Sequence, residues 1–248
     1  MLSELAAKIR RKGFTGPRYV GLGGKLRFLR ESTLARRELV FAATPESFAA
    51  APAPQGPPLE LHRIRAAAGL EPFRAGLAAA WYPGLVESFA PPLGWGEEAV
   101  IGTVDGEVAC YCWMQFGTAE GFPTYYGRML EREARILRAG VAPAFRRSGL
   151  NKLTMHRLLE RSFAAGAERV WAECYLHNLP AARTFLRIGF RAVGVLTVLE
   201  APPLRGFVRW SSLDPAAALY RRHGVDLLAA PSPASPSPVA AAEPAGVA

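Results

Sequence analysis

The feature that most constrains this chain is a strand-like run, a short basic loop and a helical pattern that follow one another. Residues 134–141 have the composition of a strand, and residues 151–165 place apolar side chains at helical spacing. Two arginines, a serine and a glycine lie between them. The sequence therefore predicts a strand, a loop and the start of a helix. The apolar positions of that helix are Met155, Leu158, Leu159 and Phe163.

The loop has the chemistry of an anion site. The first amides of a helix have no partner within the helix, and the helix dipole makes that end positive. A loop that turns those amides toward a phosphate can therefore bind it. Gly149 allows close approach of the backbone, and Arg146 and Arg147 can add charge-assisted hydrogen bonds. The alternative is a basic turn that only caps the helix.

Two motifs occur in order along this part of the chain. The first motif is Val141, Pro143, Arg146 and Gly149, and the second is Asn178, Ala181, Phe185, Gly189 and Phe190. The pair resembles the GNAT acyl-CoA transferase superfamily over residues 59–212. Two positions depart from the family pattern. Asn151 replaces a usual Gly or Ala, and Phe185 replaces the tyrosine that many members have as proposed general acid.

The resemblance implies an α/β (α+β) fold with a mixed, mostly antiparallel central sheet flanked by helices. In this family the fourth strand bulges and splays from the fifth, and the pantetheine arm of an acyl-CoA enters the gap. Gly140 and Val141 stand at that place in this sequence. Other local patterns agree with such a fold. They predict a first strand over residues 59–64, a helical stretch over 71–89 and an Asp-Gly hairpin over 99–116.

The resemblance also implies acetyl-CoA or another acyl-CoA as the cofactor. Asn178 would contact the cofactor arm, although capping the next helix is an alternative role that can coexist with it. Phe185 would pack on the pantetheine. The full set of expected cofactor-binding residues is Gly140, Val141, Arg146, Arg147, Ser148, Gly149, Leu150, Asn151, Asn178 and Phe185.

The general base is expected on the same strand as in the family. The position that carries a glutamate in many members is Arg135 here. Glu133 lies two residues earlier on the same strand face, and we expect it to be the base. Glu131 and Glu173 are further candidates. The alternative for Glu133 is a surface carboxylate paired with Arg132 or Arg135.

Tyr175 is the expected proton donor to the leaving thiolate, and His177 is the alternative. A thiolate needs little help to leave, so a dedicated acid can also be missing. Cys174 could form a covalent acyl intermediate, but its apolar strand position favours a core residue.

The ends of the chain differ from its middle. Residues 1–38 contain ten basic and three acidic residues, a net charge of +7 within the +9 of the whole chain. We expect a basic N-terminal arm with an amphipathic helix over residues 1–48 and an Ala/Pro linker over 49–58. The acyltransferase domain would follow over residues 59–228, and residues 229–248 would form a disordered Ala/Pro/Ser tail.

The composition indicates where in the cell the protein is expected and whether it binds a metal. Cys110, Cys112 and Cys174 make no disulfide framework, and the four histidines show no metal-binding spacing. We find no signal peptide and no apolar run near the ~20 residues that a membrane-spanning helix needs. These features predict a cytoplasmic protein without a metal site.

Together the patterns predict an N-acyltransferase that moves an acyl group from acyl-CoA to a primary amine by direct attack. The acceptor would be an amino sugar or another small amine. The alternative is a non-catalytic CoA-fold module that binds an anionic membrane or a partner through the basic arm. No nucleic-acid-binding motif accompanies the charge. A homodimer and peripheral contact with the inner membrane surface are further expectations.

Overall fold

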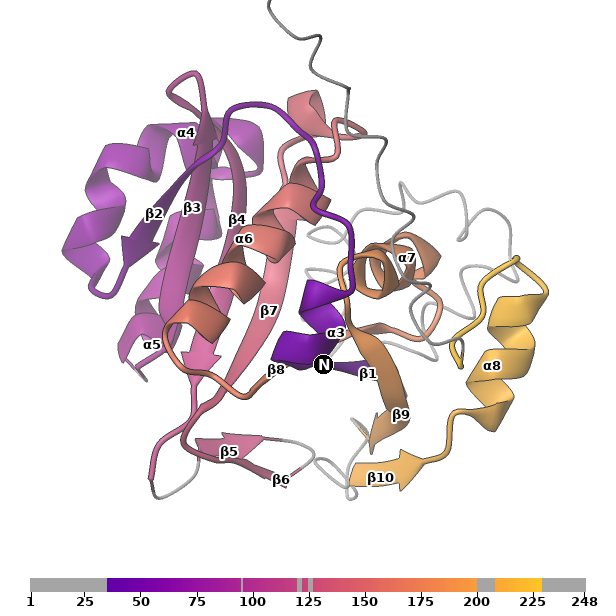
Figure 1. Ribbon diagram of the computed structural model, residues 1–248. Helices are drawn as coiled ribbons and strands as arrows, with labels where there is room; N and C mark the ends of the chain where they lie inside the picture. The colour runs from indigo at the N-terminus through magenta and orange to yellow at the C-terminus, as the bar shows by residue number, and fades with distance from the viewer. Residues whose placement is uncertain (1–34, 95, 120–121, 125–126, 200–207, 229–248) are drawn as a thin grey trace, which may run out of the picture.

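The computed structural model describes residues 35–94, 96–119, 122–124, 127–199 and 208–228. These residues form one eight-stranded sheet, in the order β10-β9-β1-β8-β7-β4-β3-β2, and a separate two-stranded ribbon, β5-β6 (Figure 1). The strands are β1 Ala35–Ala43, β2 Glu60–Ile64, β3 Glu98–Val104, β4 Glu107–Phe116, β5 Phe122–Thr124, β6 Gly127–Met129, β7 Glu133–Val141, β8 Arg169–Tyr175, β9 Arg191–Leu199 and β10 Val208–Ser211.

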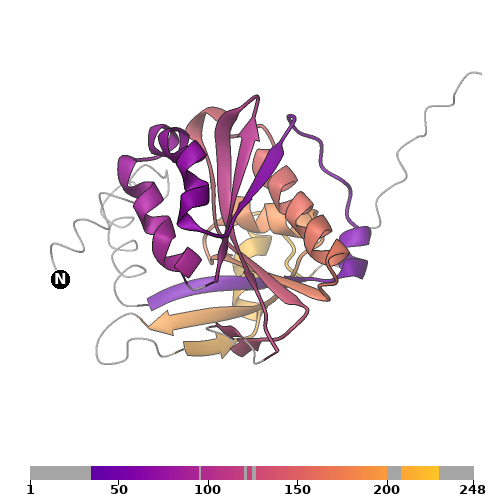
Figure 2. The ribbon, with the colours of Figure 1, turned by 90° about the vertical axis from the view of Figure 1, so that its left-hand side faces the viewer.

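Helices cover both faces of the sheet. Figure 2 shows α4 and α5 on one side of β2, β3 and β4, and α6 on the other. The α-helices are α3 Pro45–Ala49, α4 Arg74–Ala80, α5 Ala90–Gly94, α6 Leu150–Ala164, α7 Leu179–Arg187 and α8 Asp214–Arg221. The 3₁₀ segments are η2 Ala67–Phe73, η3 Pro83–Phe89 and η4 Pro143–Phe145.

The hairpin of β3 and β4 forms as predicted. Asp105 and Gly106 make its turn, with φ of 52° and 80°. Positive φ at both central residues matches the right-handed twist of the flanking strands, which is why Asp-Gly is a strong hairpin signal.

The sheet is antiparallel at every junction of the described strands except that of β7 with β8. These two strands run parallel and pair only from Glu133–Arg169 to Ile136–Ala172. Beyond Ile136 the ladder between them ends, although β7 continues to Val141. The structure therefore confirms the expected fold class, a mostly antiparallel sheet with two splayed strands.

A bulge in β7 lies at this separation. Tyr111 of β4 faces Gly140 and Trp113 faces Leu137, so Arg138 and Ala139 share the place opposite one β4 residue. Arg138 takes a φ of 51°, which residues other than glycine rarely adopt. The bulge bends β7 and directs Arg138 into the space that opens beside β8.

Strand β1 lies in the middle of the sheet, between β8 and β9. The composition of the sequence instead places this segment in a basic arm over residues 1–48, ahead of the linker at 49–58. Leu39, Val40 and Phe41 are fully buried, which is typical of a strand covered on both faces. Residues 35–43 therefore complete the sheet of the domain that follows them.

Helix α3, which follows β1 directly, packs against Gly189 of the second sequence motif. Its start is capped by Thr44 and Ser47 in a reciprocal capping box, with Pro45 in the first turn. Gly189 packs directly under it with a φ of 96°, and a Cβ there would lie 2.5 Å from the Ser47 carbonyl oxygen. Only glycine fits this contact without a shift of the backbone.

The two largest apolar clusters of the described residues flank the sheet. The larger packs α6, α7 and α8 on β1, β7, β8 and β9, and the smaller packs η2, α4, η3 and α5 on β2, β3 and β4. The expected amphipathic helix within residues 1–34 and the tail at 229–248 lie outside the described residues. Among the helices that are described, none has both the length and the apolar character to cross a membrane.

Candidate active site

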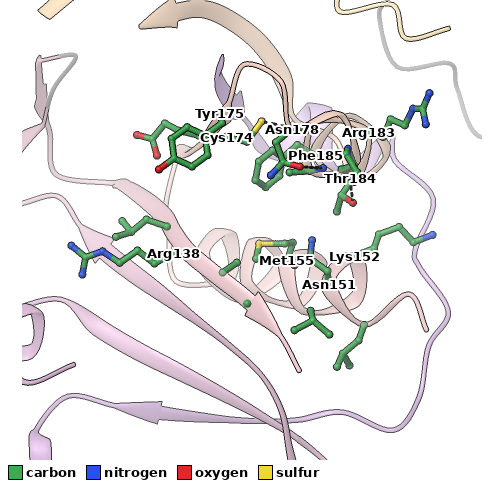
Figure 3. A pocket seen from close by; sticks show the side chains of 18 of the residues that line it. Arg138, Asn151, Lys152, Met155, Cys174, Tyr175, Asn178, Arg183, Thr184 and Phe185 are labelled. Atoms are coloured by element: carbon green, nitrogen blue, oxygen red, sulfur yellow. Dashed lines mark hydrogen bonds between the residues drawn. The ribbon is translucent and has the colours of Figure 1, made fainter. Parts of the chain in front are cut away.

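A cleft of about 1940 Å³ opens where β7 and β8 part. Its walls come from β7, the loop before α6, the first turns of α6, the end of β8, and α7 (Figure 3). Strand β1 adds Arg36 and Glu38 to the wall. The cleft therefore depends on both the splay of the sheet and the inserted N-terminal strand.

The loop at one end of the cleft begins a helix without a side-chain cap. Gly149 is the N-cap of α6 with a φ of 81°, and Arg147 also has a positive φ of 69°. The hydroxyl of Ser148 donates to the Phe145 carbonyl at 2.7 Å, and the Leu150 amide reaches the Ser148 Oγ only at 3.4 Å. This confirms the predicted loop and helix start, and it leaves the first turn of α6 facing the cleft.

Positive charge gathers around this helix start. Figure 3 shows Lys152 on α6 and Arg183 on α7 across the cleft from each other. With the helix dipole, these cations produce a positive potential that favours a phosphate group. The cationic residues that line this part of the cleft are Arg146, Arg147, Lys152, Arg183 and Arg187.

The central part of the cleft is lined mostly by glycine and apolar side chains. Gly140 and Val141 line it from β7, and a Cβ at Gly140 would lie 2.7 Å from the Tyr111 ring. Phe185 lines it from α7 while packing against Phe41, with ring centroids 5.1 Å apart.

Asn178 lies at the end of β8 and lines the same wall (Figure 3). Its Oδ1 accepts a hydrogen bond from the Ala181 amide at 3.4 Å, so it caps α7. The capping role that the sequence allowed is therefore present, and its place on the wall is compatible with a second role.

The opposite end of the cleft carries mixed charge. Glu97 is 4% exposed and accepts a hydrogen bond from Gln115 at 2.7 Å. Arg135 donates to Gln115 at 3.2 Å and pairs with Glu173 at 2.6 Å. Arg138 pairs with Glu97 at 3.3 Å. A continuous polar chain thus runs from Glu97, just before β3, across β4 and β7 to β8, and its carboxylates suit a cationic or neutral amine.

Glu133 and Tyr175, the two predicted catalytic residues, do not lie together. Tyr175 lines the cleft, is 37% exposed and stacks on His177 with ring centroids 5.8 Å apart. Glu133 is not among the lining residues. Its carboxylate accepts a hydrogen bond from the Leu130 amide at 2.9 Å and pairs with Arg169 at 3.1 Å. Glu173, a further candidate from the sequence, does line the cleft.

Cys174 is buried against the cleft, and burial raises the pKa of its thiol to about 12, with Glu38 and Glu173 adding to the rise. Burial likewise raises the pKa of Cys110 and of Cys112. A neutral thiol is a poor nucleophile, so Cys174 has the properties of a core residue. Among the described residues, no group of His, Cys, Asp and Glu side chains is arranged to hold a metal ion.

Sequence reasoning did not find Glu97, Gln115 and Arg138 as parts of the site. A signal was present for two of them, because Glu97 and Gln115 are polar residues next to or inside apolar strand runs. Buried polar side chains in such runs usually have a partner or a function. Arg138 gave no signal, because its position follows from the bulge.

Residues 78–190 match the acetyltransferase (GNAT) family. The matched segment contains β7, α6, β8 and α7, the elements that build the cleft. This match confirms the resemblance to the GNAT acetyltransferases noted in the sequence. The segment does not include β1, β2, β9 and β10, which complete the sheet.

A comparison with curated proteins gave no match. Several solved structures match part of the chain. A GNAT acetyltransferase from Colwellia psychrerythraea is 14% identical over 68% of this chain and 58% of its own, with a TM-score of 0.45. A GCN5-related N-acetyltransferase from Kribbella flavida is 16% identical over 67% of this chain and 60% of its own, with a TM-score of 0.41.

A third structure contains a GCN5-related glucosamine N-acetyltransferase region of a fungal multi-domain β-N-acetylglucosaminidase. It is 11% identical over 70% of this chain and 22% of its own, with a TM-score of 0.48. The match spans less than two thirds of each of these three solved chains.

Proposed function

We propose that this protein is an N-acyltransferase that moves an acetyl or other acyl group from acyl-CoA to a primary amine. The observation that carries the proposal is the cleft between β7 and β8, which joins a cationic helix start to a carboxylate-bearing end. A cofactor with a polyphosphate head, a thin arm and a reactive thioester matches these three parts in order.

The residues present fit such a cofactor. The amides at the start of α6, with Arg146 and Arg147, would hold the phosphates. The part of β7 that has left the ladder with β8 would offer backbone hydrogen bonds to the arm, from Gly140 and Val141. Asn178 and Phe185 would close the other side. When bound, acyl-CoA supplies an activated acyl group.

We assign Glu173 as the group that receives the proton of the attacking amine, directly or through a water molecule. It lines the cleft, whereas Glu133 is held by Arg169 and the Leu130 amide away from it. The choice of Glu173 in place of Glu133 has a simple geometric basis. Arg135 occupies the β7 position expected for the base, and the carboxylate that faces it comes from β8.

In the proposed reaction the amine nitrogen forms a bond to the acyl carbon, and the bond from that carbon to sulfur breaks. The amine proton passes to Glu173, and the Tyr175 phenol can give its proton to the leaving thiolate. Tyr175 lies two residues after Glu173 on the same strand, and both side chains line the cleft. The acceptor we propose is an amino sugar or another small amine.

The direct test is turnover with acetyl-CoA and a panel of primary amines that includes glucosamine. Release of free CoA thiol and the mass of the acetylated amine are measured together. We expect thiol release that depends on the amine. Binding of acetyl-CoA without turnover of any amine would favour a non-catalytic module, and no binding at all would contradict the cofactor assignment.

We also propose a cytoplasmic location, with the basic residues near the N-terminus in contact with an anionic membrane surface. Sedimentation with phosphatidylserine liposomes tests this, comparing the full chain with a variant that lacks residues 1–34. The cut must stop there because residue 35 begins the central strand. Equal sedimentation of the two proteins would contradict membrane contact.

A further inference from the structure

We propose that the acceptor amine carries a second, anionic group, a carboxylate or a phosphate, and that Arg138 binds it. This inference rests on the proposed acyltransfer and names the class of acceptor. Three observations support it. They are the placement of Arg138, the N–H donors of Arg138 that its contact with Glu97 does not use, and the carboxylates at the same end of the cleft.

Arg138 is held in place by the backbone. It lies in the β7 bulge opposite β4, with a φ of 51°. Its guanidinium carbon lies 5.7 Å from the ring centroid of Trp113, which is buried. The side chain lines the cleft and is 48% exposed (Figure 3). A cation is thus fixed at the cleft surface by a strained backbone and an aromatic ring.

The contact of Arg138 with Glu97 uses only a small part of the hydrogen-bonding capacity of its guanidinium. One nitrogen, Nη1, reaches Glu97 Oε2 at 3.3 Å. A guanidinium presents five N–H donors in a planar fork that matches a carboxylate or a phosphate. Glu97 is itself shared, since its other oxygen accepts from Gln115 at 2.7 Å. The fork of Arg138 can therefore bind an anion while its contact with Glu97 remains.

The proposed amine site at Glu173 is connected to this cation through other polar side chains. Glu97, Gln115 and Arg135 link Arg138 to Glu173 through consecutive polar contacts. A molecule with an amine and an anionic group would place the amine toward Glu173 and the anion toward Arg138. A neutral amine would fill only the first place. A carboxylate at one place and a guanidinium at the other therefore favour an acceptor that carries both an amine and an anionic group.

The test compares acceptors that differ only in the anion. One pair is phenylalanine and phenylalaninamide, and the other is glucosamine 6-phosphate and glucosamine. We expect the anionic member of at least one pair to have a kcat/KM higher by about tenfold or more, as for a charge-assisted hydrogen bond. The pair that shows the preference distinguishes a carboxylate from a phosphate.

The variant Arg138→Asn then removes the charge and keeps the bulge, because asparagine tolerates the positive φ at this position. We expect the preference within the pair to fall to near one. The matched control is Arg161→Asn, an equal charge change at an exposed position in the last turn of α6, which should keep the preference. Thermal melts establish that both variants are folded.

Equal kcat/KM for the members of both pairs would overturn the inference, and so would a preference that survives in Arg138→Asn. Either result leaves the proposed acyltransfer intact, because neutral amines would still be acetylated. Failure to bind acetyl-CoA and to acetylate any amine would instead contradict the proposed function and the inference together.

Discussion

The Glu173 carboxylate lies 2.6 Å from a guanidinium nitrogen of Arg135, at the point where β7 and β8 stop pairing. Both side chains are largely buried, with 6% and 13% of their surface exposed. The last residue of β8 that pairs with β7 is Ala172, so Glu173 is the first residue of β8 beyond that ladder. This position places a carboxylate from β8 on the wall of the cleft.

The first prediction concerns this carboxylate. Glu173→Gln should lower kcat by about 10²- to 10⁴-fold, the usual contribution of a general base. Binding of acetyl-CoA should change little, because the cationic loop lies at the other end of the cleft. Steady-state kinetics with the best amine of the panel measures the effect.

The matched control is Glu133→Gln, the same chemical change on the neighbouring strand. Glu133 pairs with Arg169, which is half exposed, so its loss should leave kcat within a few-fold of the wild type. A large loss of kcat in Glu133→Gln with little change in Glu173→Gln would reverse the assignment of the base.

Cys174 supplies a second prediction. With a pKa of about 12, only about one thiol in ten thousand is ionised at pH 8. No acyl-enzyme should therefore form on Cys174, and its alkylation by iodoacetamide should be slow in the folded protein. Intact-protein mass spectrometry after mixing with acetyl-CoA checks both points. An added acetyl group on Cys174 during turnover would contradict direct attack.

The same thiol predicts a pH dependence of stability. In the unfolded chain the pKa of Cys174 returns to about 9, so the unfolded state loses this proton first as the pH rises. The stabilising contribution is complete below pH 9 and is lost as the pH rises toward 12. Denaturant melts across this range should show that the free energy of unfolding falls more steeply with pH in the wild type than in Cys174→Ala.

Gly189 gives a prediction about the fold. Gly189→Ala should destabilise the protein by at least about 2 kcal/mol, because alanine at a φ of 96° is strained and its Cβ would meet the Ser47 carbonyl. Gly166→Ala is the control, since Gly166 has a φ of 89° with no atom near its Cβ position. Equal losses in the two variants by urea melts would show that α3 does not press on Gly189.

A truncation tests the place of β1. Removal of residues 1–48 should abolish folding, because it takes away the strand between β8 and β9 and leaves two open edges in the sheet. Circular dichroism and size-exclusion chromatography of the shortened chain measure the result. A folded, acetyl-CoA-binding fragment would show that the domain begins after the linker, as the sequence composition indicates.

Local patterns predicted much of this structure. The Asp105-Gly106 turn and the start of α6 after Gly149 each depend on residues close in sequence, so their signals are complete in the sequence. The resemblance carried by the two motifs implies that residues 146–151 and Asn178 belong to one site, and both segments line one cleft.

The parts that sequence reasoning could not predict depend on pairing between distant strands. The apolar run of β1 reads as a strand but does not say which neighbours it takes. Glu133 and Arg135 share a strand face, and only the end of the β7–β8 ladder decides that Arg135 reaches the cleft while Glu133 pairs with Arg169. Arg138 owes its direction to a bulge whose place depends on the register with β4.

The measurement that tests the central proposal most directly is a calorimetric titration of acetyl-CoA into the wild type and into an Arg146→Ala/Gly149→Glu variant. The variant removes a cation, strains a residue at a φ of 81° and places a carboxylate at the start of α6. We predict micromolar binding to the wild type and a loss of at least about 100-fold in the folded variant. Equal affinity of the two proteins, or no binding to the wild type, would contradict a cofactor site at this loop.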